Sequence, residues 1–392
     1  MRKDPKDIMR NNLLVRNPVA NAILRIINFI LPNSNKNDKI ESHLVESILV
    51  CNNAHLGDVI LSTAVLNALK ISFPNARIYF LGGSWSKDIY CNHELISDYF
   101  FYDHWKLNRT SKPIYRKAIT YFKSVFSLIK QLRKTKIDLA IDLYFYYPNS
   151  SFWLWISRVP IRMGYTSGGF GKLYTHAMKW EVKQQTVVDY YYDLLSNFLK
   201  QEFTRSLFKP NVTLNSDIKE RLNDILIKLN FNQSDYSVVH IGTGLKMKEW
   251  PMDNWNALID KLSQQDFKIF FTGYGSRENE LISKLIENRD GCYSLCGELS
   301  FLETACCIKQ AKFLVCVDSV AAHLGACFDT PTIVIGNGIN DNILWRAQST
   351  SVKSIIWPTH CTPCYTGCAE MECVRNITSE TVHKNLMQLL KK

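Results

Sequence analysis

FLVCVDSVAAHLGACFDTPTIVIG, residues 313–336, holds a strand, a helix and a second strand in one short run. The apolar residues 313–318 are typical of a buried strand, residues 321–328 of a helix, and residues 332–338 of another strand. Two strands joined through a helix make a βαβ unit, in which the strands are parallel. The stretch therefore predicts an α/β fold with a parallel sheet covered by helices.

The same alternation of strands and helices continues on both sides of this stretch. In the second half, strands are predicted over residues 237–242, 267–273 and 293–297, with helices over residues 255–262, 278–286 and 301–310. In the first half, strands are predicted over residues 47–53, 77–83, 99–103 and 138–144, with one helix over residues 59–73. The chain therefore contains two consecutive Rossmann-like, doubly wound series.

The two series meet near residues 201–215, where the pattern loosens. At 392 residues and 46% hydrophobic content, the chain is long enough for two domain cores. Ligands of open α/β sheets bind at the carboxyl ends of the strands, so we expect the two sheets to face a central cleft. The expected parts are an N-terminal extension over residues 1–44, domains over residues 45–208 and 209–375, and a C-terminal helix over residues 376–392.

An apolar segment, VANAILRIINFIL at residues 19–31, lies within the N-terminal extension. It is too short to span a bilayer, which takes roughly 20 apolar residues. With Arg10, Arg16 and Arg25 in or near it, the segment fits an amphipathic helix on the anionic inner face of the cytoplasmic membrane. It fits equally a helix packed on the protein's own surface, because the apolar stripe is the same in both cases. Residues 32–42 are polar and fit a linker.

The chain is strongly basic, with a formal net charge of +11. A basic chain favours anionic partners such as nucleic acid, anionic lipid or phosphorylated substrates, or it serves solubility alone. No recognised nucleic-acid-binding motif is present, so we expect no nucleic-acid partner. Residues 105–136 mix Lys and Arg with aromatic residues, which fits a solvated helix face or a contact with an anionic acceptor or lipid. Residues 1–12 resemble no secretory signal, so we expect a cytoplasmic protein.

Three strand-to-helix junctions in the second half carry residues suited to a diphosphate. Glycines let a phosphate approach the backbone, and a helix N-terminus offers free N–H groups to an anion. A lysine adds a positive point charge. The candidate nucleotide-binding residues at these junctions are Gly242, Thr243, Gly244, Lys248, Gly273, Asp318, Ser319 and His323. The alternatives are an N-cap role for Ser319, a buried position for His323 and a surface position for Lys248.

Asp58 opens a predicted helix soon after the first strand. An aspartate at such a position often serves as the N-cap of the helix. At the mouth of the cleft, the same carboxylate could take a proton from an attacking hydroxyl. We expect Asp58 to be the catalytic base, with His55 as the next candidate.

Three segments together resemble the family of lipopolysaccharide heptosyltransferases, glycosyltransferase family 9. They are AHLGDVILSTAVLNALKISFPNARIYFLGG at residues 54–83, HIGTGLKMKEWPMDNWNALIDKL at residues 240–262, and the stretch at residues 313–336. The resemblance runs from about Ser47 to about Thr381, in order and with sensible spacing. The chain departs from the family at Val320, where the family usually has Gly, and in its N-terminal extension.

The resemblance implies a GT-B fold and an inverting, metal-independent transfer in synthesis of the bacterial cell envelope. The donor would be a nucleotide sugar, ADP-heptose, with no further cofactor, and the acceptor an anionic, lipid-linked glycan of the lipopolysaccharide type. By the same resemblance, Asp58 is the base and Glu278 lies near the donor ribose. Lys248, Ser319 and His323 would hold the donor diphosphate.

Four cysteines cluster near the C-terminus: Cys361, Cys364, Cys368 and Cys373. The first two have the spacing of a metal knuckle, but the short intervals favour structural thiols over a Zn site, so we expect no metal. Two other function classes stay open. One is a sugar-nucleotide epimerase on a similar two-domain fold, and the other is a non-enzymatic nucleic-acid-binding protein suggested by the charge and the cysteines.

Overall fold

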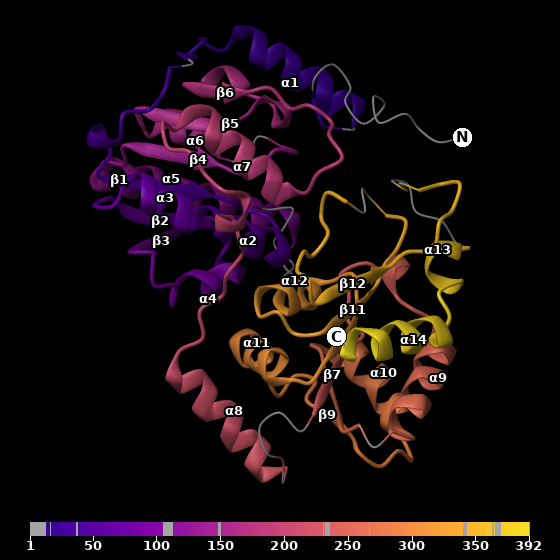
Figure 1. The fold of residues 1–392 in the computed structure, drawn as a ribbon. Coiled ribbons are helices and arrows are strands. Elements are labelled where there is room, and N and C mark those ends of the chain that lie inside the picture. The colour runs from indigo at the N-terminus through magenta and orange to yellow at the C-terminus, as the bar shows by residue number, and fades with distance from the viewer. Residues whose placement is uncertain are drawn as a thin grey trace. The chain divides into compact units, whose positions relative to one another are not determined.

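The computed structural model divides the chain into two compact units (Figure 1), the first ending at Thr213 and the second beginning at Leu214. Each unit is built on one six-stranded sheet in which all strand pairs are parallel. The structure describes residues 13–15, 17–36, 38–104, 113–147, 150–229, 231, 236–265, 267–339, 343–362, 364 and 370–391. Within those ranges no helix has the length and apolar character needed to cross a membrane.

The first unit has the strand order β3-β2-β1-β4-β5-β6. Its strands are β1 Ser47–Cys51, β2 Arg77–Gly82, β3 Asp98–Phe101, β4 Leu139–Asp142, β5 Ile161–Tyr165 and β6 His176–Met178. Its helices are α1 Pro18–Ile30, α2 Leu56–Ser62, α3 Leu66–Ser72, α4 Lys87–Tyr90, α5 Ile114–Thr135, α6 Ser151–Ile156 and α7 Val187–Phe198. Every residue of β1 is buried, as expected for a central parallel strand with helices on both faces.

The second unit repeats the same topology, in the order β12-β11-β10-β7-β8-β9. Its strands are β7 Ser237–His240, β8 Ile269–Thr272, β9 Cys292–Ser294, β10 Leu314–Val317, β11 Thr332–Ile335 and β12 Val352–Ile355. Its helices are α8 Ser216–Lys228, α9 Met252–Ser263, α10 Ser276–Ile286, α11 Phe301–Gln310, α12 Val320–Cys327, α13 Glu372–Arg375 and α14 Ser379–Leu390. Two consecutive Rossmann-like units confirm the predicted GT-B fold class.

The strand order reverses at one point in each sheet, between β1 and β4 in the first and between β7 and β10 in the second. Where the order reverses, the helices leave the sheet on opposite sides, and a ligand can bind beyond the carboxyl ends of the strands. The loops that follow β7 and β10 carry most of the candidate donor residues. The helix that follows β1, α2, carries Asp58 in its first turn.

The single helix predicted over residues 59–73 is wrong in detail. The helix begins earlier, at Leu56, and the 3-10 turn Thr63–Val65 separates α2 from α3. The hydroxyl groups of Ser62 and Thr63 donate to the carbonyls of Val59 and Ile60, both at 2.7 Å. Side-chain bonds of this kind compete with the helical ladder and bend a helix, which accounts for the break.

The N-terminal segment is part of the first unit, although the sequence suggested an extension and a linker before residue 45. Its backbone bonds to the unit at three places: Leu14 N–H to Ser167 O at 2.9 Å, Ser34 N–H to Lys172 O at 2.8 Å, and Ile40 N–H to Phe198 O at 2.9 Å. Leu13, Val15 and Leu24 form a small buried cluster with Phe170 packed against it. These bonds fix α1 on the first unit.

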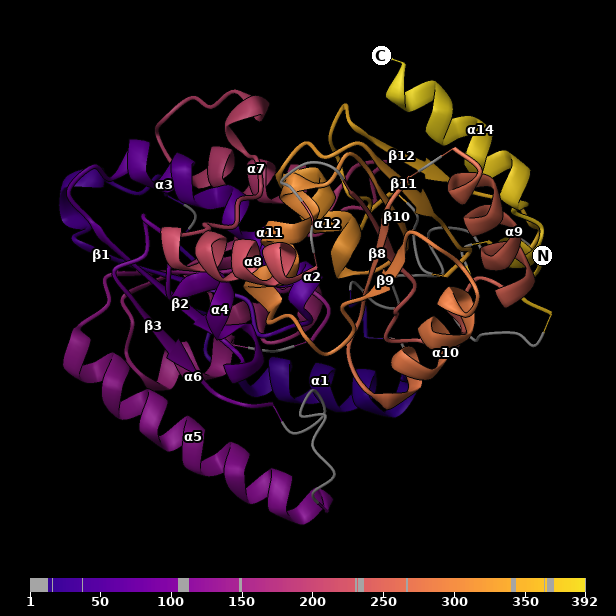
Figure 2. The ribbon, with the colours of Figure 1, turned by 90° about the horizontal axis from the view of Figure 1, so that it is seen from below.

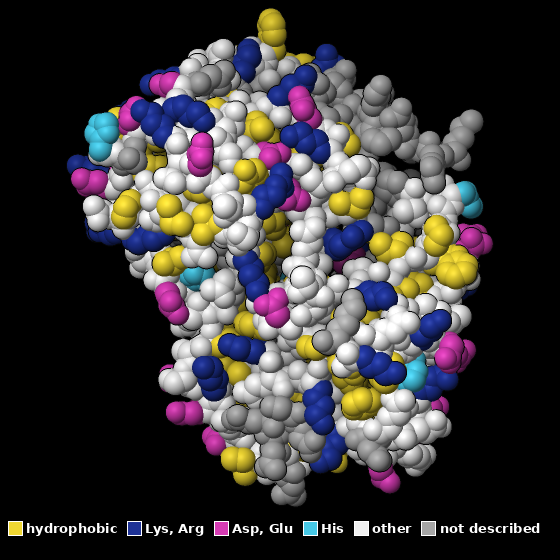
Figure 3. All heavy atoms as spheres, viewed as in Figure 1, with side chains coloured by type: hydrophobic (Ala, Val, Ile, Leu, Met, Phe, Trp, Pro, Cys, Tyr) yellow, Lys and Arg dark blue, Asp and Glu magenta, His cyan; other side chains and the backbone are white. Residues whose placement is uncertain are grey.

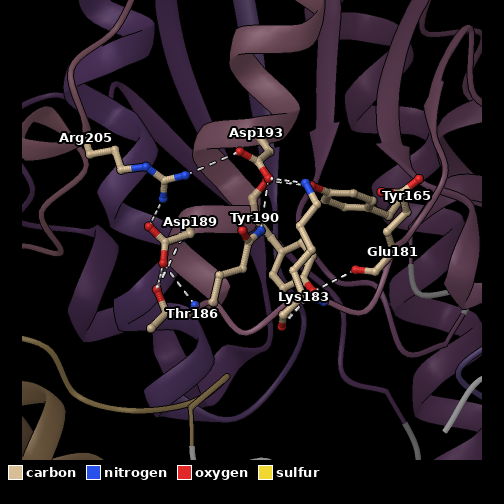
Figure 4. Close-up of polar contacts among 9 residues, drawn as sticks. Tyr165, Glu181, Lys183, Thr186, Asp189, Tyr190, Asp193 and Arg205 are labelled. Atoms are coloured by element: carbon tan, nitrogen blue, oxygen red, sulfur yellow. Dashed lines mark hydrogen bonds and ion pairs between the residues drawn. The ribbon is translucent and has the colours of Figure 1, made fainter. Parts of the chain in front are cut away.

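Acidic residues of α7 hold the loop between β6 and α7 in place (Figure 4). Lys183 Nζ lies 3.0 Å from Asp193 Oδ2. The acidic residues Asp189 and Asp193 also pair with Arg205, which follows the helix. Lys183 N–H donates to the hydroxyl of Tyr190 at 2.8 Å. The loop at this carboxyl edge of the first sheet is therefore tied to α7 by both charges and hydrogen bonds.

Candidate active site

The candidate donor residues gather at the reversal point of the second sheet. The loop after β7 carries Gly242 and places Lys248 in the 3-10 turn Lys246–Lys248. Asp318 and Ser319 follow β10 directly. Thr243 is partly buried and Gly244 is exposed on the same loop. The sequence therefore placed these residues correctly at the ends of neighbouring strands.

An ion pair joins the two loops, because Lys248 Nζ lies 2.7 Å from Asp318 Oδ2. Asn337, which follows β11, donates from Nδ2 to the same oxygen at 3.0 Å and accepts from Ile339 N–H at 2.8 Å. Burial alone would raise the pKa of Asp318, but the Lys248 ammonium and the Asn337 amide hold it below its ordinary value. An ionised Asp318 thus fixes the position of the Lys248 ammonium. Asn337 was not among the candidates, because the strand predicted over residues 332–338 included it, whereas β11 ends at Ile335.

The first turn of α12 presents two buried polar atoms. Among the described residues, neither the hydroxyl of Ser319 nor Nδ1 of His323 has a hydrogen-bond partner. Ser319 is the residue that precedes α12, but its side chain makes no capping bond. A buried polar atom without a partner is costly, and a ligand that supplies the partner relieves that cost. Val320 starts the helix with helical geometry, so the absence of the family's usual glycine strains nothing.

Burial lowers the pKa of His323 to about 4, with the Lys248 ammonium adding to the effect and Asp318 opposing it. The imidazole is therefore neutral at pH 7. A neutral imidazole donates one hydrogen bond and brings no charge. Positive charge in this group of residues comes from Lys248.

Glu278, near the start of α10, lies against the two glycine loops. A Cβ on Gly242 would stand 2.3 Å from Glu278 Oε2, and a Cβ on Gly273 would stand 2.6 Å from it. Tyr274 N–H donates to the same oxygen at 2.9 Å. Burial raises the pKa of Glu278, and the Tyr274 bond opposes that rise. The glycines are needed here because any side chain would displace the carboxylate.

Asp58 lies in the first turn of α2, at its third residue. The residue that precedes the helix is His55, which corrects the reading of Asp58 as the N-cap. His55 N–H donates to Asp58 Oδ2 at 3.1 Å, and Asn52 Nδ2 donates to the Asp58 carbonyl at 3.1 Å. The Asp58 side chain is only partly buried. The carboxylate thus stabilises the helix start and is still accessible to solvent.

A second carboxyl group, Asp142, stands at the carboxyl end of β4 beside β1 and was not singled out from the sequence. Burial raises its pKa to about 7, although the hydroxyl of Tyr174 donates to it at 2.9 Å. The backbone N–H groups of Tyr144 and Ser150 also donate to this carboxyl. Only 1% of Asp142 is exposed. It cannot touch an acceptor and instead holds the loop after β4.

Comparison with known proteins identifies the family. The model of glycosyltransferase family 9 (heptosyltransferase) matches residues 125–374. The chain belongs to this family. The matched range includes two of the three motifs, at residues 240–262 and 313–336, while the motif that contains Asp58 precedes it.

This family 9 glycosyltransferase is 25% identical, over 316 residues, to lipopolysaccharide heptosyltransferase 3 of Escherichia coli; the match covers 76% of this chain and 84% of the relative. Two solved structures share its fold. The family 9 glycosyltransferase of Veillonella parvula DSM 2008 is 17% identical with a TM-score of 0.74, over 91% of this chain and 99% of the other. E. coli heptosyltransferase WaaC with ADP is 18% identical with a TM-score of 0.65, over 88% and 99%.

The C-terminal cysteines of the transferase differ in their exposure to solvent. Cys361 is exposed, Cys364 is partly buried and Cys373 is buried, while Cys368 lies outside the described residues. Within the described ranges no three His, Cys, Asp or Glu side chains form a group that could hold a metal ion. Since Cys368 is not among them, the choice between structural thiols and a Zn site stays a prediction.

Substituting Gly242 with alanine is expected to weaken donor binding about tenfold, the usual worth of one hydrogen bond to a charged group. The added Cβ forces the Glu278 carboxylate away, and a flexible side chain can move without disturbing the backbone. The melting temperature should therefore barely change. Donor titration of Gly242→Ala, Glu278→Ala and the double variant tests this.

The double variant should bind donor as weakly as Glu278→Ala alone, because both changes remove the same carboxylate contact. If the two losses of donor affinity add in the double variant, Gly242 and Glu278 act separately. That result would contradict the prediction that Gly242 acts through the Glu278 carboxylate.

The second unit is expected to lose stability as the pH falls from about 6.5 to about 4. Burial lowers the pKa of both His240 and His323 to about 4, whereas an unfolded histidine titrates near 6.5. Between these values the unfolded chain binds protons that the folded chain does not, so each histidine removes up to about 3 kcal/mol of unfolding free energy. Urea unfolding at several pH values measures this loss.

His240→Gln should flatten the pH dependence of stability, because glutamine keeps a polar partner for Thr272, which lies 3.0 Å from His240 Nδ1, without titrating. His360→Gln, at an exposed histidine that follows β12, is the matched control and should leave the slope unchanged. If the unfolding free energy of wild type and of His240→Gln depends on pH with the same slope, His240 does not cause the loss of stability.

Proposed function

We propose that this transferase moves a heptose from ADP-heptose to a lipid-linked glycan acceptor of the lipopolysaccharide type, with inversion at the anomeric carbon and without a metal ion. Support comes from the family, from the relative named lipopolysaccharide heptosyltransferase 3 and from the ADP in the WaaC structure. The observation that carries the proposal is the arrangement at the end of β10. There the Lys248 ammonium lies 2.7 Å from Asp318, beside the N-terminus of α12.

The proposed donor site uses that arrangement to bind the diphosphate. The Lys248 ammonium supplies positive charge, since Asp318 occupies only one of its three N–H donors. The free N–H groups at the start of α12, the Ser319 hydroxyl and His323 supply hydrogen bonds to the phosphate oxygens. Glu278 lies two strands away, after β8, where its carboxylate can accept from the ribose hydroxyls.

In the proposed reaction, Asp58 takes the proton of an acceptor hydroxyl. The acceptor oxygen forms a bond to the anomeric carbon on the face opposite the nucleotide while the bond from that carbon to the diphosphate oxygen breaks. The electron pair leaves with ADP, whose new negative charge Lys248 and the α12 N-terminus stabilise. The sugar is transferred once, so its anomeric configuration inverts.

The metal independence of the proposal rests on that supply of positive charge. Transferases that use a divalent cation place it on the donor diphosphate to neutralise the leaving group. Here Lys248 and the helix N-terminus act on the same oxygens, so we propose that activity survives EDTA. The acceptor places the enzyme at the cytoplasmic face of the inner membrane, with nucleotide sugar and anionic glycolipid as its partners.

A donor screen tests the proposal. Purified full-length protein is incubated with ADP-, UDP- and GDP-linked sugars, with and without a heptose-accepting lipopolysaccharide core, and nucleotide release is measured with and without EDTA. ADP release from ADP-heptose that depends on the acceptor and resists EDTA is the expected result. Turnover without an acceptor would favour an epimerase, and loss of activity in EDTA that Mg²⁺ restores would overturn the metal-independent mechanism.

A further inference from the structure

Helix α1 is packed with its polar side inward. Asn21 is 2% exposed and donates from Nδ2 to Val15 O at 3.0 Å, while Leu24 is the only large apolar side chain of the helix that is buried. The exposed apolar side chains of α1 are Val19, Ile23, Ile26, Ile27, Phe29 and Ile30, with Phe29 84% and Ile30 75% exposed. A helix that only covered its own protein would turn this face toward the core. Among the described residues of the first unit no side chain covers this face, so it is available to a partner.

Helix α5 carries a second exposed apolar stripe. Its buried side chains are Val125, Leu128 and Leu132. Tyr115, Ile119, Phe122 and Phe126 follow helical spacing on another side, and all four are more than half exposed.

The α5 stripe lies on the flank that faces α6. Arg133 Nη2 donates to Ile156 O, the last residue of α6, at 2.8 Å. At 100° per residue, Tyr115, Phe122 and Phe126 all fall within about 20° of Arg133 around the helix. The exposed aromatic residues of α5 therefore lie on the same face of the helix as Arg133, which bonds to the end of α6.

Aromatic rings of α6 connect α5 to α1. Tyr121 of α5 lies 6.2 Å from Trp153, and Trp153 lies 5.1 Å from Phe152, measured between ring centroids. Phe152 in turn lies 5.9 Å from Phe170, which packs on the buried cluster beneath α1. Figure 2 shows α1, α5 and α6 on one side of the sheet, away from α3 and α7. Ring contacts thus link α5, through α6, to the cluster beneath α1, and the three helices lie on the same side of the sheet.

Charge on this surface is of one sign. None of the three helices contains Asp or Glu, whereas α1 contains Arg25 and α5 contains six Lys and Arg. Beside α1, Lys172 Nζ donates to Phe29 O at 3.1 Å and lies 5.7 Å from the Phe29 ring centre. Figure 3 shows a hydrophobic side chain projecting at the top of the view, where α1 runs in Figure 1, with Lys and Arg around it.

We propose that α1, α6 and α5 form a docking face for an anionic phospholipid bilayer. Interfacial helices combine apolar and aromatic side chains with Lys and Arg, as these three helices do. Trp and Tyr prefer the level of the lipid headgroups, and each Lys or Arg gains from an anionic surface. A second copy of this chain would bring like charges together, which opposes association. The inference goes beyond the transfer reaction, because it concerns a partner that takes no part in the chemistry.

Vesicle sedimentation of the full-length protein tests the apolar part of the face. Wild type should sediment with vesicles of phosphatidylcholine and phosphatidylglycerol. Ile26→Ser/Phe29→Ser should lower the partition coefficient by about 10²-fold, because two apolar side chains no longer enter the bilayer. The matched control is Ile227→Ser in α8, since Ile227 is 67% exposed and Ile26 is 63% exposed. This control should bind as wild type does.

The contribution of the basic residues to vesicle binding is tested with Lys123→Gln/Lys130→Gln in α5. Lys228→Gln in α8 is the control variant. The double variant should bind about 25-fold more weakly, since each of the two charges near an anionic surface contributes about fivefold. High salt should reduce the difference. Unchanged melting temperature and unchanged ADP release with a soluble acceptor show that the variants are folded and keep the transfer reaction.

Absence of wild-type binding to anionic vesicles, or equal binding of wild type and Ile26→Ser/Phe29→Ser, would overturn the proposal. A stable dimer that the same double variant dissociates would assign the face to a second copy and overturn it as well. None of these results depends on the donor or the acceptor, so they are separate from a failure of the proposed transfer reaction.

Discussion

Asp58→Asn is expected to lower turnover by about 10²- to 10⁴-fold, the usual effect of losing a general base. Donor affinity should hardly change, because Asp58 belongs to the first unit and the candidate donor residues belong to the second. An asparagine oxygen can still accept from His55 N–H, which lies 3.1 Å from Asp58 Oδ2, so the start of α2 should be retained. Turnover, donor affinity and melting temperature are to be measured on the same preparation.

Asp189→Asn is the matched control for this variant. Asp189 is also the third residue of its helix and also accepts from the N–H of the residue before the helix, Thr186, at 3.0 Å. It additionally pairs with Arg205, so its loss should cost at least as much stability as the loss of Asp58. Turnover by Asp189→Asn should nevertheless be normal. If both variants turn over normally, Asp58 stabilises a helix and another group is the base.

The central strands of both sheets could be predicted because they are short apolar runs between turn residues. The strands β10 and β11 fall inside the predicted ranges, and so do the ends at which the candidate site residues lie. The strands β5, β6 and β12 were missed. The first contains Arg162 and Gly164, the second has only three residues, and the third is nowhere fully buried, so none shows the apolar run of an inner parallel strand.

Long-range partners could not be predicted, because they depend on the register of the whole sheet. Asn337 reaches Asp318 only because β11 lies beside β10. The burial that raises the pKa of Asp142 to about 7 comes from packing around the end of β4, while its sequence neighbours look like those of any strand. Sequence spacing indicated which strand ends carry the site but not which side chains contact one another.

The orientation of α1 shows a further limit of sequence reasoning. Hydrophobic periodicity gives the width of an apolar face but not its direction, so a helix on a membrane and a helix on its own protein gave the same pattern. The contacts of Asn21 decide the direction here, since a buried amide that donates to Val15 O turns the apolar side outward.

Lys248→Met is expected to lower turnover by about 10²- to 10³-fold, the usual effect of removing one group that stabilises charge in the transition state. Negative charge on the diphosphate grows as the bond to the sugar breaks, so kcat should fall more than donor affinity. Lys246→Met is the matched control, because Lys246 occupies the same short turn but is exposed. It should turn over nearly as wild type does.

A double variant at the ion pair separates a structural role of Lys248 from a catalytic role. Without Lys248, the partly buried Asp318 carboxylate loses its ion-pair partner and keeps the hydrogen bond from Asn337, which should destabilise the fold. Lys248→Met/Asp318→Asn removes that unpaired charge, so stability should recover toward wild type while turnover stays low. Recovery of turnover together with stability would show that Lys248 only neutralises Asp318. A low turnover in a stable double variant would place the Lys248 ammonium on the departing diphosphate.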